Sequence, residues 1–264
     1  MSELWFAFSL TLLAGLSTGL GAVIALLTKP TNRSFLAASL GLSGGVMIYV
    51  SLVEILPLGQ EAIASEHDPK AAAWMSAAAF FGGIAIAAII DRLVPEGVNP
   101  HEPRLNRSEM HGVDPHLLRV GLVTALAVGL HNFPEGFATF MTALKEPSLA
   151  SPGAVAIAIH NIPEGIAVAV PIHHATKSKW RAFVIALGSG LAEPIGALIG
   201  YLLLRPFLSQ TMLGAVLASV AGIMIFISLD ELLPTAEKYG KHHVAIYGVI
   251  AGMALMAISL IMLS

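Results

Sequence analysis

The 264-residue sequence contains no cysteine, and only 12% of its residues are charged. A chain without cysteine has neither a disulfide framework nor a thiolate metal site. Soluble domains carry about 25% charged residues, whereas this chain is 56% hydrophobic with a mean hydropathy of +0.78. The net charge of −3 is too small to indicate a nucleic-acid partner. These features predict an integral membrane protein.

Eight apolar stretches are long enough to cross a bilayer as helices, which takes about 20 residues. They cover residues 4–27, 35–57, 71–94, 117–144, 153–174, 180–204, 212–233 and 244–263. The first stretch lacks a basic segment before it and exceeds the core of a signal peptide, so we expect it to be retained as a span. We predict an all-α, polytopic membrane protein with eight transmembrane helices and a single domain over residues 1–264.

Lysine and arginine are unevenly divided between the two sets of loops. The loops after odd-numbered stretches hold eleven of these residues and the opposite loops hold three. Because cytoplasmic loops carry an excess of Lys and Arg, we expect the odd-numbered side to be cytoplasmic and both termini to face outward. Residues 95–116, on the cytoplasmic side, are rich in Pro, Gly and Asn and carry His101, His111 and His116, which predicts a mobile loop.

An internal repeat relates the second and seventh stretches. Residues 45–57 align with residues 222–234, and eight of these thirteen positions are identical. The two stretches cross the membrane in opposite senses, so we predict an inverted repeat in which spans 1–3 match spans 6–8 around a central pair, 4–5. Inverted repeats that surround polar sites on helices near the bilayer midplane are typical of secondary transporters.

Two near-identical hexapeptides lie inside the fourth and fifth stretches: His-Asn-Phe-Pro-Glu-Gly at residues 131–136 and His-Asn-Ile-Pro-Glu-Gly at residues 160–165. On a helix, His and Glu four residues apart share a face. Proline inside a helix also displaces the carbonyl four residues earlier. Ionisable residues at membrane depth indicate a functional site. The candidate residues are His131, Asn132, Glu135, His160, Asn161 and Glu164.

A third carboxylate, Glu193, lies in the sixth stretch, again directly before a proline. Each such charge costs roughly 2.5–3.5 kcal/mol at the bilayer centre, and no Lys or Arg lies at that depth in stretches four to six. We therefore expect a bound divalent metal. Imidazole, carboxylate and amide ligands suit Zn²⁺, Fe²⁺, Mn²⁺ or Co²⁺, and the two histidines argue against Mg²⁺ and Ca²⁺. The alternative is that these groups only hydrogen-bond the helices together.

Four further polar residues have two open interpretations each. Glu54 and Glu231 are repeat mates near opposite membrane faces, and each is a vestibule metal ligand or a carboxylate at a helix end. His173 and His174 end the fifth stretch on the cytoplasmic side. They either accept a departing metal or lie at the membrane interface.

The two H-N-x-P-E-G motifs, followed by Ala192-Glu193-Pro194 and a glycine at position 196, resemble the ZIP (Zrt/Irt-like) family of divalent-metal transporters, most closely its bacterial members. The resemblance covers essentially the whole chain. It implies metals between helices four, five and six. It further implies a zinc-preferring site of Glu135, His160 and Glu164 with His131 nearby, and a second site of Asn132, Glu135, Asn161, Glu164 and Glu193.

We therefore predict a transporter, not an enzyme, that moves divalent transition metals from outside into the cytoplasm. Zinc is the preferred substrate, with Fe, Mn and Co as further cargo, and no catalytic cofactor is expected. The expected partners are metal ions and the lipid bilayer, with a homodimer left open and no nucleic acid. Two alternatives remain: an intramembrane di-metal hydrolase or oxygenase, and a metal-selective channel.

Overall fold

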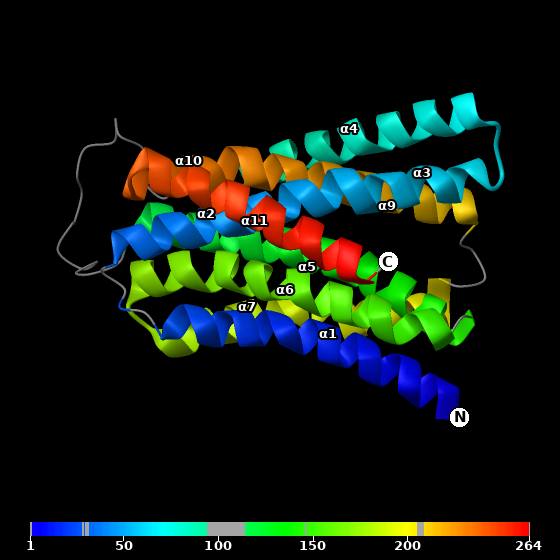
Figure 1. Cartoon of the computed structure of the whole chain (residues 1–264), viewed down its shortest axis with the longest axis horizontal. Coiled ribbons are helices and arrows are strands. Elements are labelled where there is room, and N and C mark those ends of the chain that lie inside the picture. The colour runs from blue at the N-terminus through cyan, green and yellow to red at the C-terminus, as the bar shows by residue number, and fades with distance from the viewer. Residues whose placement is uncertain are drawn as a thin grey trace.

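The computed structural model describes residues 2–27, 29, 32–93, 114–145, 147–204 and 209–263, and all regular structure in these ranges is helical (Figure 1). The helices run side by side along the long axis of the molecule. The expected all-α fold is confirmed. The sequence predicts a mobile loop over residues 95–116, and residues 95–113 of this segment lie outside the described residues.

The helices follow the expected order of spans, and three spans consist of more than one helical segment. They are α1 (Ser2–Leu26); α2 (Arg33–Val50), η1 (Ser51–Ile55) and α3 (Leu56–Ala64); α4 (Pro69–Leu93); α5 (Pro115–Lys145); α6 (Pro147–Thr176); α7 (Lys179–Gly190), α8 (Ala192–Ile199) and η2 (Gly200–Leu204); α9 (Gln210–Ile227), η3 (Ser228–Leu232) and α10 (Leu233–Tyr239); and α11 (His242–Leu263).

Side chains that accept hydrogen bonds from backbone N–H groups define where several of these helices begin. Such caps satisfy N–H groups that have no partner within the helix and contribute about 1 kcal/mol each. The bonds join Phe35 N to Asn32 (3.0 Å), Ala71 N to Asp68 (3.1 Å), Leu117 N to Asp114 (3.2 Å), Arg181 N to Ser178 (3.3 Å) and Met212 N to Ser209 (3.1 Å).

Within the described residues, seven helical segments are long and apolar enough to span a membrane by themselves. The eighth expected span corresponds to α6, which is 30 residues long and carries five His, Asn and Glu residues. It packs against α1, α2, α5 and α7, so protein surrounds much of its polar face. The polar residues of α6 therefore lie on a helix enclosed by other helices, as expected for a span that carries a site.

The sequence repeat forms the same irregular element twice. η1 and η3 are short π-helical segments over Ser-Leu-Val-Glu-Ile and Ser-Leu-Asp-Glu-Leu. In each, the N–H of the next residue donates to the serine carbonyl five residues earlier, from Leu56 to Ser51 and from Leu233 to Ser228. The following residue is a proline in both copies, which has no N–H to continue the helical ladder. Figure 1 shows that the two spans run in opposite directions.

Helix packing repeats in the same way, which confirms the inverted repeat. α2 packs against α11 in one half, and its mate α9 packs against α4 in the other. Likewise α1 packs against α6, and α8 packs against α5. The central pair, α5 and α6, is thus held on its two sides by equivalent helices.

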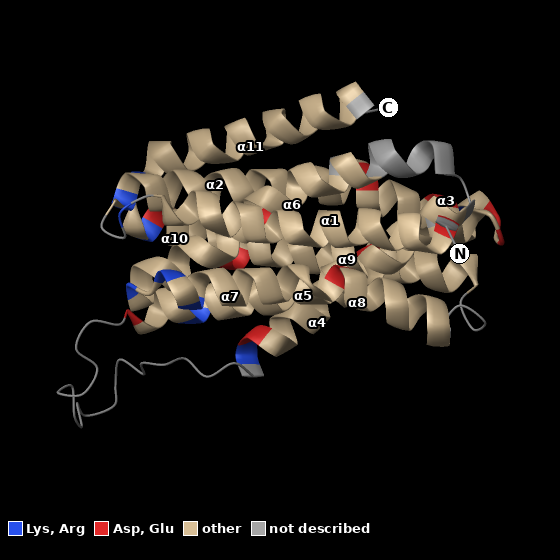
Figure 2. Cartoon of the chain, turned by 90° about the horizontal axis from the view of Figure 1, so that it is seen from below, with Lys and Arg blue, Asp and Glu red and all other residues tan. Residues whose placement is uncertain are grey.

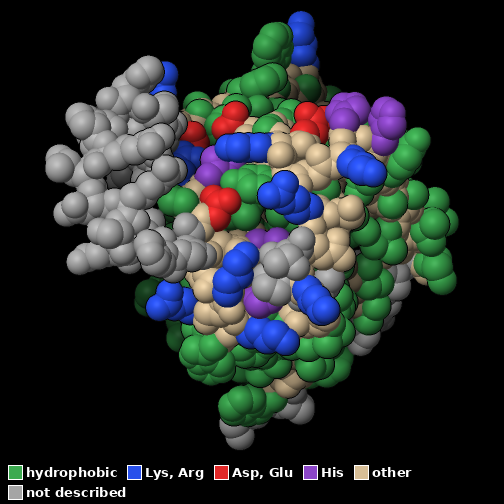
Figure 3. Space-filling view, turned by 90° about the vertical axis from the view of Figure 1, so that its left-hand side faces the viewer, with side chains coloured by type: hydrophobic (Ala, Val, Ile, Leu, Met, Phe, Trp, Pro, Cys, Tyr) green, Lys and Arg blue, Asp and Glu red, His purple; other side chains and the backbone are tan. Residues whose placement is uncertain are grey.

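The basic residues gather at one end of the bundle. Figure 2 shows Lys and Arg at the left-hand end, and both chain termini lie toward the other end. Figure 3, which faces the left-hand end, shows these basic side chains around several histidines. The charge asymmetry in the sequence is therefore also an asymmetry between the two ends of the molecule.

Candidate metal centre

The fold brings all seven predicted site residues together from three helices. The first hexapeptide lies on α5, the second on α6, and Glu193 in the first turn of α8. Glu135 is partly exposed, and the other six are buried: His131, Asn132, His160, Asn161, Glu164 and Glu193. Figure 2 shows acidic residues part-way along the bundle, between its two ends.

The histidine of each hexapeptide contacts the glutamate of the other. His131 Nε2 lies 2.8 Å from Glu164 Oε1, and His160 Nε2 lies 3.0 Å from Glu135 Oε1. His131 Nδ1 also lies 3.0 Å from the carbonyl of Ala127, which orients its ring. The pairing is thus between helices, although the four-residue spacing puts His and Glu of one copy on the same helix face.

The two asparagines are held by their amide nitrogens. Asn132 donates to the carbonyl of Ser189 (3.3 Å), and Asn161 donates to the carbonyl of Ala14 (3.0 Å). Asn161 also donates to Glu193 Oε2 at 2.8 Å, which joins α6 to α8. With the nitrogens occupied in this way, the side-chain oxygens of both amides are left available as ligands.

Five buried oxygens of this centre have no hydrogen-bond partner among the described residues. They are Asn132 Oδ1, Glu135 Oε2, Asn161 Oδ1, Glu164 Oε2 and Glu193 Oε1. Leaving buried polar groups unpaired costs about 1–3 kcal/mol each, and more for charged groups. These three carboxylates and two amide oxygens come from neighbouring helices, and a divalent cation bound among them would satisfy them. Within the described residues, no three of the His and Glu ligand atoms of this centre lie within 4.8 Å of one another, so binding would have to draw them together.

The dimensions of the pairs suit a small cation. Zinc binds nitrogen and oxygen at about 2.0–2.2 Å, so two ligand atoms of a tetrahedral site lie roughly 3.4 Å apart. The two His–Glu pairs, at 2.8 and 3.0 Å, are closer together than that, so a bound metal would move each pair apart by about half an ångström. A metal would take the place of the proton between imidazole and carboxylate, and protons would compete with it.

The last residue of each hexapeptide explains how the helices come so close. A Cβ on Gly136 would collide with the backbone of Glu193, and a Cβ on Gly165 would collide with the backbone of Thr18. Only glycine permits this approach. α5 continues through Pro134, and α6 continues through Pro163, whose carbonyl accepts a bond of 2.6 Å from Ser43 Oγ.

Glu54 and Glu231, the repeat mates, have different environments. Glu54 lies in η1, near enough to His160 and Glu135 for their charges to act on it. Glu231 lies in η3 and accepts a bond of 2.8 Å from Arg119. Glu231 is therefore paired with a cation already, whereas Glu54 lies within electrostatic range of the candidate centre.

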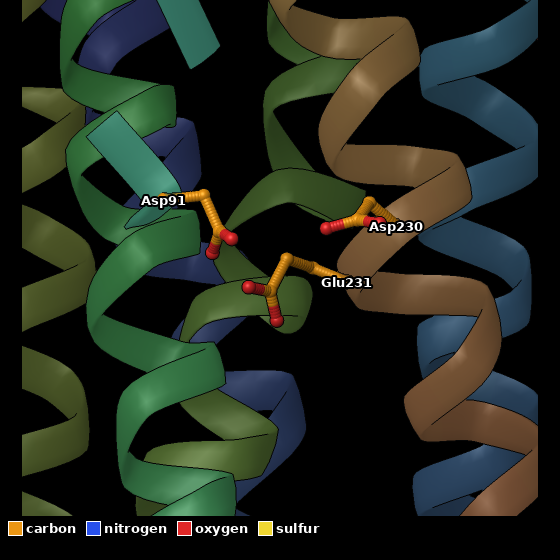
Figure 4. A group of neighbouring side chains, drawn as sticks. All are labelled: Asp91, Asp230 and Glu231. Carbon is orange, nitrogen blue, oxygen red and sulfur yellow. The ribbon is translucent and has the colours of Figure 1, made fainter. Parts of the chain in front are cut away.

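Arg119 connects Glu231 to Asp91, a partner that the sequence did not suggest. Its guanidinium lies 2.5 Å from Asp91 Oδ1, and Figure 4 shows Asp91 and Glu231 facing one another. With Asp230 these carboxylates have oxygens within 4.8 Å of one another. Because Arg119 already neutralises two of the three, this group is an ion-pair cluster between α4, α5 and η3.

His173 and His174 are buried at the basic end of α6. His174 Nδ1 lies 2.9 Å from the carbonyl of Val170, and the backbones of Asn32 and Ser178 lie close to the rings of His174 and His173. Their role in accepting a departing metal stays a prediction.

Comparison with known proteins gives consistent results over the length of the chain. The sequence pattern described as "ZIP Zinc transporter" matches residues 96–260. The protein named "Zinc transporter ZupT" of Streptococcus mutans is 57% identical over 260 residues, 98% of each chain. The protein of that name in Corynebacterium glutamicum is 58% identical over 259 residues, and that in Chlorobium luteolum 55% over 266 residues, each with at least 97% of both chains covered.

Proposed function

Because the chain belongs to the ZIP family of zinc transporters, we propose that it carries zinc through the centre formed by α5, α6 and α8. The observation that supports this most strongly is the crossed pairing of His131 with Glu164 and of His160 with Glu135. Each imidazole–carboxylate pair offers a nitrogen and an oxygen to the same ion. Glu193 and the two asparagine oxygens complete a ligand set for one or two ions.

The direction of transport is from the end that holds the termini toward the basic end, which is the cytoplasmic side of a bacterial inner membrane. The bias of Lys and Arg supports this orientation. Zinc enters past Glu54, binds at the crossed pairs, and leaves toward His173 and His174 as the two repeats rearrange. Inverted repeats on both sides of a central site suit alternating access.

The cargo extends beyond zinc to Fe²⁺, Mn²⁺ and Co²⁺. The ligands are imidazole nitrogens and carboxylate or amide oxygens, which bind all four ions, and the chain has no cysteine to select softer metals. The protein is a transporter and not an enzyme. The His and Glu residues therefore bind substrate and do not activate a metal-bound water for chemistry.

Zinc uptake into proteoliposomes tests this function. Wild type should accumulate zinc, whereas Glu164→Ala should lose uptake, because Glu164 is fully buried and pairs with His131. Glu237→Ala is a matched control, since Glu237 pairs with the exposed His242 on the surface. Wild-type protein that takes up no zinc, or Glu164→Ala that transports normally, would refute the proposal.

A further inference from the structure

The contacts of the two hexapeptides reveal a second correspondence, between α1 and the α7–α8 segment. Asn132 donates to the carbonyl of Ser189, and Asn161 donates to the carbonyl of Ala14. The two asparagines are equivalent members of the repeated motif. Ala14 therefore has the same place beside α6 that Ser189 has beside α5.

The close approaches of glycines extend this correspondence along the helices. The backbone of Glu193 covers Gly136, and the backbone of Thr18 covers Gly165. In the other direction, Gly196 lies against the carbonyl of Phe133, and Gly21 lies against that of Ile162. These contacts define three pairs of equivalent residues: Ala14 with Ser189, Thr18 with Glu193 and Gly21 with Gly196. The members of each pair are 175 positions apart in the sequence, and equivalent residues of the two hexapeptides are 29 positions apart.

Thr18 is thus the counterpart of Glu193, the residue assigned to the metal centre. The Cβ atoms of the two residues lie next to equivalent glycines. A Cβ on Gly15 would lie 3.4 Å from the Cβ of Glu193. A Cβ on Gly190, the counterpart of Gly15, would lie 2.7 Å from the Cβ and 2.8 Å from the Oγ1 of Thr18. Glycine in both places leaves room for the two side chains.

The hydroxyl of Thr18 is buried and unused. Thr18 and Glu193 are both 0% exposed, and Thr18 Oγ1 has no hydrogen-bond partner among the described residues. Other hydroxyls on α1 are bonded: Thr11 Oγ1 donates to Ala7, and Ser17 Oγ donates to Ala14. A buried hydroxyl without a partner is costly unless something else satisfies it.

We infer that Thr18 is a further ligand of the metal centre, and that Thr18 and Asn132 together form an uncharged oxygen subsite for a divalent cation. This subsite mirrors the charged one formed by Glu193 and Asn161, and the inference rests on the proposed metal transport. Asn132 Oδ1, like Thr18 Oγ1, has no hydrogen-bond partner among the described residues, so neither oxygen is committed to another group. The centre has three carboxylates and not four because α1 carries Thr18 at the position where the equivalent helix, α8, carries Glu193.

Moving the carboxylate across the centre tests this inference. Glu193→Thr should lower zinc affinity, measured by isothermal titration, by about tenfold to a hundredfold, as for other losses around metal sites. Adding Thr18→Glu should restore affinity and uptake to within a few-fold of wild type, because the carboxylate returns at the mirrored position. Ser17→Glu in the Glu193→Thr background is the control, since Ser17 bonds to Ala14 and should rescue nothing. Equal failure of both double variants would overturn the inference.

A spectroscopic measurement keeps the inference testable if the double variant does not fold. Thr18→Cys is nearly isosteric and introduces the only thiol in the chain. Cadmium should then produce a thiolate-to-metal charge-transfer absorption that saturates at one ion per chain, and Ser17→Cys should produce none. Thr18→Cys protein that elutes like wild type but shows no such band would refute a ligand role. This readout does not depend on transport, so wild-type protein without zinc uptake would refute the proposed function separately.

Discussion

At the scale of the residue, the crossed pairs explain why the motif occurs twice. His131 pairs with Glu164 and His160 pairs with Glu135, so one hexapeptide alone would leave a buried imidazole and a carboxylate without partners. Breaking a buried pair by removing one member typically costs about 3–5 kcal/mol. Substitutions of one motif should therefore impair the other.

Glutamine substitutions should distinguish the two glutamates Glu164 and Glu193. Glu164→Gln removes a carboxylate that lies against His131, so we expect transport to collapse and metal binding to fall. Glu193→Gln keeps an oxygen beside Asn161. We therefore expect this variant to bind one of the two ions more weakly, to have altered selectivity among zinc, iron and manganese, and to retain some zinc transport. Metal counting by isothermal titration and anomalous scattering would measure both. Two ions still bound in Glu164→Gln, or none in Glu193→Gln, would contradict this assignment.

At the scale of the element, two kinds of feature set the helix positions: glycines at crossings and acceptors at helix ends. Gly136 belongs to the first kind because it lets α8 approach α5 at Glu193. Glu66 belongs to the second kind, because it joins the turn between α3 and α4 to the start of α9.

Gly136→Ala should separate α8 from α5 and displace Glu193 from the centre. An added methyl would meet the backbone of Glu193, and such overpacking costs about 1–3 kcal/mol. We expect zinc affinity to fall in protein that still inserts and elutes normally. Gly82→Ala is a matched control, since nothing lies within 4 Å of that position. Equal zinc affinity in the two variants would show that the approach at Gly136 does not position Glu193.

Glu66 should make the stability of the outer end depend on pH. The bond of 2.6 Å from Thr211 Oγ1, together with the N–H groups of Thr211 and Gln210, holds the pKa of the Glu66 carboxyl below its ordinary value of 4.5. A lowered pKa in the folded state stabilises above pH 4.5, and this stabilisation is lost as the pH falls through the folded value. Glu66→Gln should therefore lower Tm slightly near pH 7 but not at pH values below both pKa values. A difference in Tm that is the same at both pH values would contradict this role.

At the scale of the whole molecule, the inverted repeat and the charge bias together set an axis through the membrane. The basic end contains the ion pairs of Arg119 and the buried His173 and His174. The opposite end contains Glu66 and both termini. The candidate centre lies between them.

Cysteine labelling should establish the orientation of this axis. The chain has no cysteine of its own, so a single introduced thiol gives no background. Ser65→Cys, an exposed position in the turn before α4, should react only from outside, and Ser108→Cys only from the cytoplasm. An impermeant maleimide applied to intact cells and to inverted vesicles would measure this. The reverse pattern would overturn the orientation and the direction of transport.

The sequence by itself determined the helical class and the order of the spans, and it predicted which residues form the candidate centre. The long apolar runs permit only helices that satisfy their own backbone in lipid. The repeated motif marks the residues of the central pair, because buried charges are too costly to occur there without a function. The repeat of residues 45–57 and 222–234 likewise predicted that the two halves run in opposite directions.

Only the tertiary structure decided which of these residues meet. His131 contacts Glu164 and not Glu135, because helix packing, and not spacing along one helix, sets the distance between α5 and α6. Asp91 and Arg119 are far apart in the sequence, and their pairing depends on how α4 and α5 are placed relative to one another. Thr18 has no motif around it, and its correspondence with Glu193 follows only from the backbone contacts that Gly165 and Gly136 allow.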